Sequence, residues 1–275
     1  MAVTCMAILY PTPKNNPDVN AVYRYYDRMG HDAAASIKDK VPVFMFCQFL
    51  ELLNFKFDVI VLTEICTYYC NILPGYQFHY ALPALPDNTK VGGVGLFVRC
   101  VYDVQEVSDY TIASSDSNKI ENLWLEISKE NNKFIVGGIY RHPNQNISDF
   151  KTSFEHIQDK ISSQPLPCVI AGDMNIDLVK STCHTGISHY VDNLLMHNFL
   201  PTILMPTRIT KTSATLIDHM YYYEGSKRSD AISLKSGNLL TDISDHLPNF
   251  TILTKATKVP AKSRPKVRIF SSKNI

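Results

Sequence analysis

The stretch CVIAGDMN, residues 168–175, is the part of the sequence that decides the fold. A short apolar run is followed at once by Asp173 and Asn175. Such a run, bounded by turn residues, is typical of a buried strand. A single aspartate after a strand is more often a turn former than a catalyst. The inference therefore depends on whether the pattern recurs.

The same pattern of an apolar strand ending in a polar side chain recurs along the chain. The run Phe57–Leu62 ends just before Glu64, and Phe134–Tyr140 ends in a tyrosine followed by Arg141. Ligands gather at strand ends in α/β architectures, so we expect these side chains to converge at one sheet edge. The later polar positions of this kind are Asp218, Asp245 and His246.

The remaining elements indicate many strands and few helices. A helix capped by Ser148 would bury Phe150 and Phe154 on one face, and Tyr190 with Leu194 indicates a second helix. The irregular spacing does not fit a regular βαβ barrel and predicts an α/β sandwich with mixed sheets inside. Further strands are expected at Val94–Val98, Leu123–Ile127, Leu216–Tyr223, Ala231–Leu234 and Phe250–Leu253.

Composition excludes several classes of protein. The 275 residues carry a net charge of +1, are 45% hydrophobic and 19% charged, which excludes wholesale disorder and a histone-like coat of positive charge. No apolar run approaches the ~20 residues needed to span a bilayer, and the N-terminus makes a poor secretory signal. We therefore expect an intracellular protein that is neither secreted nor bound to a membrane.

The cysteines also favour an intracellular, reducing compartment. Their number, 7, is odd, and they are scattered along the chain. Cys66 and Cys70 form a lone CxxxC, for which buried reduced thiols are a better interpretation than a zinc site.

The polar strand ends suit metal-assisted hydrolysis of a phosphodiester. A hard cation such as Mg²⁺ takes oxygen ligands, and Glu64 could supply one. Asp173 could orient or deprotonate a water held by Asn175. An imidazole, His246, could stabilise the phosphorane oxygens, with Asp218 fixing its tautomer.

Five strings resemble the endonuclease/exonuclease/phosphatase superfamily, which has the DNase I-like fold. They are VLTE, GIYRHP, AGDMNIDL, TLIDHMYY and SDHLP, and the resemblance covers about residues 43–254. It implies a four-layer α/β sandwich, with two mixed, mainly antiparallel sheets flanked by helices, and Mg²⁺ as cofactor, Mn²⁺ being the alternative.

The resemblance also implies a role for each matching residue. Glu64 and Asp245 would lie at the metal, and Tyr140 would contact the scissile phosphate. Asp173 would be the general base with Asn175 as its partner. Asp218 would orient His246, the catalytic imidazole.

Within the superfamily, the sequence is most similar to endonuclease domains of non-LTR (LINE-type) retrotransposons. The strings LPGYQFHY, GGVGLFV, PTRITKTSATLIDHMYY and KSRPKVRIFSSKNI carry this likeness. It implies a monomeric enzyme that nicks DNA in the nucleus, with Arg141, Thr207 and Arg208 contacting DNA.

One departure from the family concerns its first motif, a strand ending in asparagine. The corresponding string here, HDAAASIKDK at residues 31–40, has no asparagine, and we expect no strand before it. We therefore divide the chain into a divergent segment 1–40, a catalytic domain 41–254 and a basic tail 255–275. The tail is either a solvated terminus or a nucleic-acid contact.

Two alternatives to a DNA endonuclease stay open. The same fold could act on another substrate, as a sphingomyelinase, an inositol-phosphate phosphatase or an mRNA deadenylase does. Without the first-motif asparagine, the chain could also be a weak or inactive DNA-binding remnant.

Overall fold

The computed structural model describes residues 2–9, 49–53, 55–65, 73–82, 92–114, 119–143, 145–226, 232–241 and 244–255, with backbone alone for residues 2–9. Cys66, Cys70, the string at 31–40 and the tail beyond 255 lie outside these residues. None of the described helices is long and apolar enough to cross a membrane.

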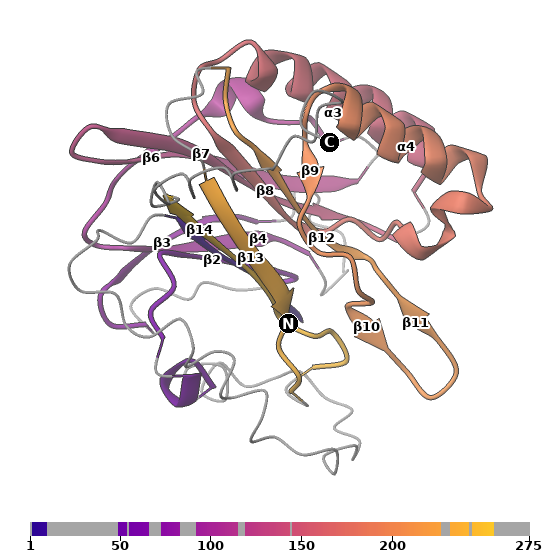
Figure 1. The fold of residues 1–275 in the computed structure, drawn as a ribbon, viewed down its shortest axis with the longest axis horizontal. Helices are drawn as coiled ribbons and strands as arrows, with labels where there is room; N and C mark the ends of the chain where they lie inside the picture. The colour runs from indigo at the N-terminus through magenta and orange to yellow at the C-terminus, as the bar shows by residue number, and fades with distance from the viewer. Residues whose placement is uncertain are drawn as a thin grey trace, which may run out of the picture.

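Two six-stranded sheets form the centre of the molecule (Figure 1). The first, here the β1 sheet, has the order β13 (Ile232–Asn238), β14 (Asn249–Lys255), β1 (Ala2–Leu9), β2 (Val59–Thr63), β4 (Val94–Arg99), β3 (Tyr76–Ala81). The second, here the β7 sheet, has the order β5 (Asp103–Glu106), β6 (Ile120–Lys129), β7 (Asn132–Arg141), β8 (Cys168–Asp173), β12 (Asp218–Tyr223), β9 (Leu200–Pro201).

The interior between the sheets is apolar. Every residue of β2 and β8 is buried, as expected for strands covered on both faces. Val61 and Leu96 of the β1 sheet share one core cluster with Val136 and Val169 of the β7 sheet. The continuous apolar runs of the sequence therefore became the central strands.

Two helices, α3 (Ile147–Ser162) and α4 (Thr185–Met196), cover the outer face of the β7 sheet (Figure 1). Phe150 and Phe154 are buried there, as predicted. The N-cap is Asn146, whose side chain accepts from the Ser148 N–H, so the predicted cap at Ser148 was two residues late. Short 3₁₀ helices lie at Ser108–Tyr110 and Leu178–Thr182.

The outer face of the β1 sheet is covered by the short helix at residues 49–53. Phe49 and Leu53 of this helix pack in one cluster with Ile60, Phe97 and Phe250 of the sheet. Helix, sheet, sheet and helix follow one another, which confirms the predicted four-layer α/β sandwich.

The expectation that no strand precedes residue 41 was wrong, because β1 lies between β2 and β14. It runs antiparallel to β2, with Ala2 opposite Thr63, and parallel to β14, with Leu9 opposite Leu253. Its apolar run is short and Pro11 follows closely, which hid the strand in the sequence. Because β2 ends at Thr63, the start of β1 lies beside Glu64 and its end at Leu9 lies at the opposite edge.

A small hairpin projects from the sandwich beside β12 (Figure 1). It consists of β10 (Arg208–Ile209) and β11 (Ala214–Thr215). The Thr210 side chain accepts the backbone N–H groups of Thr212 and Ser213, which closes the turn. Thr207 and Arg208, the two residues predicted to contact DNA here, lie at the start of the hairpin, and the strand that begins with Asp218 follows its end.

Candidate active site

Three neighbouring strands of the β7 sheet bring the predicted site residues to one edge. Tyr140 in β7 lies opposite Asp173 in the parallel β8, and Asp173 lies opposite Asp218 in the antiparallel β12. The ends of β7 and β8 therefore meet the beginning of β12. This register confirms the predicted convergence of these three side chains.

The β1 sheet adds a carboxylate to this edge. Glu64, just after β2, has a left-handed backbone with φ of 56°. Its Oε1 accepts a hydrogen bond of 2.8 Å from the Tyr140 hydroxyl, which links the two sheets. Burial and the Glu64 charge raise the pKa of Tyr140 above its ordinary value. Tyr140 therefore stays protonated and acts as a donor.

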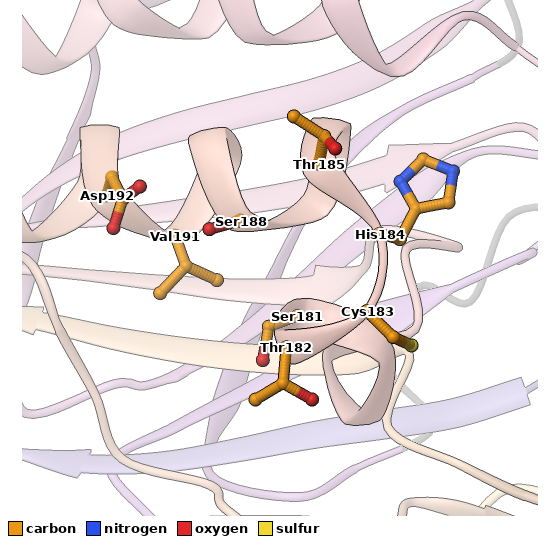
Figure 2. A pocket seen from close by; sticks show the side chains of 8 residues that line it. All are labelled: Ser181, Thr182, Cys183, His184, Thr185, Ser188, Val191 and Asp192. Carbon is orange, nitrogen blue, oxygen red and sulfur yellow. The ribbon is translucent and has the colours of Figure 1, made fainter.

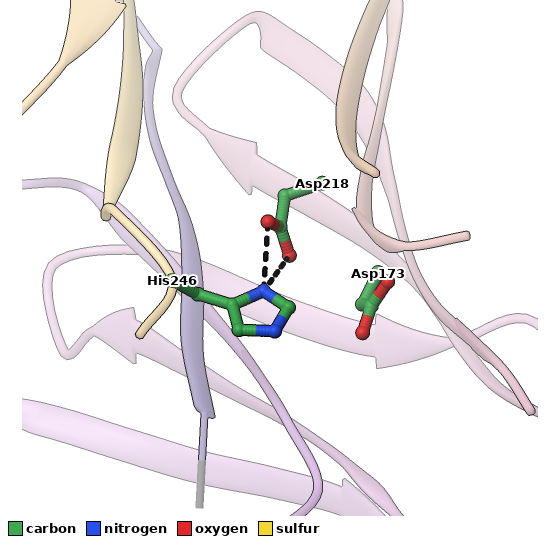
Figure 3. A group of neighbouring side chains, drawn as sticks. All are labelled: Asp173, Asp218 and His246. Atoms are coloured by element: carbon green, nitrogen blue, oxygen red, sulfur yellow. Dashed lines mark hydrogen bonds and ion pairs between the residues drawn. The ribbon is translucent and has the colours of Figure 1, made fainter. Parts of the chain in front are cut away.

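Asp218 and His246 form a buried carboxylate–imidazole pair (Figure 3). The Nδ1 atom of His246 lies 2.9 and 3.0 Å from the two Asp218 oxygens. Burial works against the imidazolium, but Asp218, followed by Asp173 and Asp245, raises the pKa of His246 to about 9. The imidazole is therefore charged at neutral pH, with Nδ1 donating to Asp218.

Asp173 completes a cluster with this pair. One ligand atom from each of Asp173, Asp218 and His246 lies within 4.8 Å of the others, and Figure 3 shows all three side chains converging. Burial and the neighbouring Asp218 raise the pKa of Asp173 well above its ordinary value. Two buried carboxylates beside Glu64 are oxygen donors that fit a hard divalent cation.

The turn after β8 fixes Asp173 and Asn175. The Asn175 N–H donates to Asp173 Oδ1, and its side-chain nitrogen donates to the Arg141 carbonyl at 2.8 Å. Gly172 has φ of 150°, and a Cβ there would lie 1.8 Å from the Ile139 carbonyl oxygen. The GDMN string therefore needs its glycine for the close approach of β7 and β8.

Arg141 is the first residue whose predicted contact with DNA needs correction. It is 2% exposed, and its terminal nitrogens donate to the carbonyl oxygens of His142 and Gln145. Its guanidinium also lies 5.8 Å from the centre of the Phe150 ring. The side chain thus folds inward and shapes the loop after β7, and it does not face a nucleic acid.

Thr207 is the second residue whose predicted contact with DNA needs correction. It is buried, and its Oγ1 accepts the backbone N–H groups of Ile217 at 3.3 Å and Asp218 at 3.0 Å. Its carbonyl accepts the Leu247 N–H, one residue after His246. Thr207 therefore holds the beginning of β12 against the segment that carries the histidine.

Arg208 and Asp245 lie at the surface of the site. Their side chains are 43% and 57% exposed and form an ion pair of 2.7 Å. Partial burial works against the Asp245 charge, but the bond to Arg208 outweighs it and lowers the pKa of this carboxyl. The contacts of Arg208 with DNA and of Asp245 with a metal stay predictions, and a metal at Asp245 would compete with Arg208.

Sequence reasoning missed two histidines near the site. His219 Nε2–H donates to the Ile176 carbonyl, beside Asn175, and Nδ1 accepts from the Tyr221 hydroxyl, both at 2.8 Å. Burial lowers the pKa of His219 to about 4, so it is neutral. The other is His142, which pairs with Glu121. The string GIYRHP contained the signal for His142, but its partner is visible only from the strand register.

A surface pocket of about 510 Å³ lies away from this cluster, between Leu178–Thr182 and α4 (Figure 2). Cys183, His184 and Asp192 are among its lining residues. None of the residues predicted for catalysis lines it, so the pocket and the carboxylate–imidazole cluster are separate features.

The four-layer α/β sandwich carries, at one edge, an acidic site that fits a metal. The sequence model of the Endonuclease/Exonuclease/phosphatase family matches residues 8–246, and the chain belongs to this family. Members of the family generally depend on a divalent metal, and the cluster in Figure 3 offers suitable ligands. No curated protein matches the sequence.

Several solved structures are similar to the chain. The endonuclease domain of TRAS1, a telomere-specific non-LTR retrotransposon, is 12% identical, with a TM-score of 0.55 over 78% of this chain and 92% of that one. The human Nocturnin catalytic domain is 14% identical, with a TM-score of 0.51 over 78% and 86%. Danio rerio (D. rerio) TDP2 with a single-strand DNA product is 12% identical, with a TM-score of 0.54 over 74% and 88%. At these identities, the likeness establishes the fold.

Proposed function

We propose that the protein is a divalent-metal-dependent phosphodiester hydrolase that nicks DNA, derived from a non-LTR retrotransposon. The observation that carries the proposal is the convergence of Asp173, Asp218 and His246 within 4.8 Å of one another. The Tyr140–Glu64 hydrogen bond lies beside them and joins the two sheets. Acidic groups, a charged imidazole and a phenol at one strand-end edge suit attack of water on a phosphodiester.

Metal binding is assigned to Glu64, whose carboxylate accepts the hydrogen bond of Tyr140, with Mg²⁺ as the proposed ion. A divalent cation there would neutralise charge on the phosphate oxygens. It would also favour the ionised form of Asp173, which burial and Asp218 otherwise disfavour. Asp173, next to the fixed Asn175, would take a proton from the water that attacks phosphorus as the P–O bond to the leaving oxygen breaks.

Two side chains at this edge would donate hydrogen bonds to the phosphate. His246 is held by Asp218 through Nδ1, which leaves Nε2 to donate to a phosphate oxygen. The hydroxyl of Tyr140, kept protonated, is a second donor. Asp218 acts by fixing the tautomer and the orientation of the imidazole.

DNA as substrate is supported by the surface next to this cluster. Arg208 is exposed at the base of the projecting hairpin, and Ile209 beside it is 53% exposed. A cation next to an exposed apolar side chain fits a phosphate backbone and a groove. The similar TRAS1 domain is itself an endonuclease domain, and the LINE-like strings agree with this choice.

A weak or inactive remnant is the second candidate, favoured by the direction of β1. Its last residue, Leu9, lies opposite Leu253, away from the beginning of β14 near His246. The end of this strand therefore lies at the opposite edge of the sheet from the beginning of β14. If the missing asparagine matters here, cleavage is slow but retains the same metal and carboxylate dependence.

A plasmid-nicking assay tests the proposal. Supercoiled DNA is incubated with the protein and Mg²⁺, with EDTA, or with Asp173→Asn in place of the wild type. Asp192→Asn, an exposed carboxylate on α4, is the matched control. We expect nicking by the wild type and the control alone. Nicking that survives both EDTA and Asp173→Asn would refute the proposal, and wild-type DNA binding without nicking would favour the inactive remnant.

A further inference from the structure

A second carboxylate–imidazole pair lies at the same sheet edge. His142 Nε2 lies 2.9 and 3.0 Å from the two oxygens of Glu121. The Glu121 side chain is 5% exposed, whereas that of His142 is 17% exposed. A buried carboxylate thus holds an imidazole that reaches the surface.

The strand register places this pair beside the proposed catalytic residues. Glu121 in β6 lies opposite Tyr140 in β7. The Tyr140 and His142 rings meet edge to face, with centroids 4.8 Å apart. Along the edge, β6, β7, β8 and β12 follow in order. At about 4.8 Å per strand, the two pairs lie on opposite sides of Tyr140 and Asp173, close enough for one DNA strand to reach both.

The surroundings of His142 favour an anion. Its N–H donates to the carbonyl of Lys119, which brings this lysine to the same rim. Within the part of the chain that the structure describes, no ion pair involves the Lys119 side chain. Arg141, the other cation of the loop, folds inward. Lys119 is therefore the cation that this rim offers to a ligand, next to the imidazole ring of His142.

We propose that His142, held by Glu121, forms with Lys119 a second phosphate subsite, which binds a non-scissile phosphodiester of the DNA strand being cut. The inference rests on the proposed function and adds a substrate-binding group on the side of Tyr140 away from His246. A purely structural role, tying the loop after β7 to β6, is the competing explanation. The two differ in whether a particular phosphate of the substrate is recognised.

The first test compares binding with chemistry. Binding of a labelled DNA duplex is measured in EDTA over a range of salt, and single-turnover cleavage is measured with Mg²⁺ at saturating DNA. For His142→Gln we expect about tenfold weaker binding with an unchanged cleavage rate, and for Lys119→Gln a salt slope smaller by about 1. Lys119→Gln, which leaves the Glu121 pair intact, should weaken binding less. Lys133→Gln, at the far end of the same hairpin, is the control and should bind normally.

The second test identifies the phosphate. Each phosphate near the cleavage position is replaced in turn by a neutral methylphosphonate. We expect one position, distinct from the scissile phosphate, at which the replacement weakens wild-type binding but not His142→Gln binding. Equal sensitivity of both proteins at every position would overturn the subsite. So would a His142→Gln variant that binds normally but cleaves slowly.

The same experiments separate this inference from the proposed function. If the wild type cleaves DNA and no phosphate depends on His142, the subsite alone fails. If the wild type neither binds nor cleaves DNA, the proposed function fails and the subsite fails with it. Thermal unfolding of each variant confirms that binding is compared between folded proteins.

Discussion

The two carboxylate–imidazole pairs of the site edge have the same chemistry but different surroundings. Asp218–His246 is buried next to a third group, Asp173, and Thr207 holds its strand in place. Glu121–His142 has a tyrosine ring on one side and the surface near Lys119 on the other. We infer from the comparison that the groups around a pair, and not the pair itself, decide whether its imidazole serves the scissile phosphate or a second one.

Asp173→Asn should have the largest effect, because it removes the carboxylate that distinguishes the first pair from the second. We expect a loss of about 10³-fold in the single-turnover cleavage rate, with DNA binding retained. The substitution keeps the size of the side chain, so the fold is preserved. Cleavage at the wild-type rate would show that the general base lies elsewhere.

A third imidazole, His219, forms hydrogen bonds with carbonyl and hydroxyl oxygens. It can be compared with the two pairs through the pH dependence of folding stability. Its folded pKa of about 4 lies below the ordinary value of 6.5. The stability that the neutral imidazole gives to the folded state is therefore fully present above about pH 6.5. It is lost as the pH falls toward 4. Between pH 7 and 5, urea unfolding in EDTA should show a loss of about 2 kcal/mol more for the wild type than for His219→Gln. Equal losses would contradict the buried neutral imidazole.

Asp218→Asn tests whether the first pair works through the orientation of His246. The amide cannot hold the charged imidazole, so the pKa of His246 should fall from its raised value near 9. We expect cleavage about 10²-fold slower. NMR titration of the imidazole and the single-turnover rate are the measurements, and Asp192→Asn is the control. A normal rate with a lowered pKa would remove the imidazolium from the mechanism.

Thr207→Val should have the smallest effect of these changes. It leaves the N–H groups of Ile217 and Asp218 without the Oγ1 acceptor, which costs about 1–3 kcal/mol of folding free energy. We expect about tenfold slower cleavage, because Asp218 and His246 shift together. Thr207→Ser keeps the hydroxyl and should restore both values. Wild-type stability and rate in Thr207→Val would show that the hydroxyl does not hold the beginning of β12 in place.

Much of the fold was predictable because continuous apolar runs of strand length, bounded by turn residues, are typical of buried strands. Glu64, Tyr140 and Asp173 follow or end such runs, so their convergence could be foreseen. Strand β1 could not be predicted in this way, because its apolar run is short and precedes a proline-containing segment. Its direction depends on pairing with both β2 and β14, which no local pattern specifies.

The roles of individual side chains were less predictable. Arg141 and Thr207 resemble surface residues in sequence, but the loop after β7 and the segment before β10 fold back and bury them. Glu121 became a candidate only once its register with Tyr140 was known. Burial and pairing between distant segments, which sequence patterns do not encode, decided these positions.

The most direct measurement compares His246→Gln with His142→Gln on one DNA duplex, with affinity and single-turnover rate determined for each. We predict that His246→Gln cleaves at least about 10²-fold more slowly at saturating DNA while binding within a few-fold of the wild type. His142→Gln should bind about tenfold more weakly and cleave at the wild-type rate once saturated. The account would be contradicted if His142→Gln lost cleavage rate while His246→Gln lost only affinity, or if both variants lost the same rate.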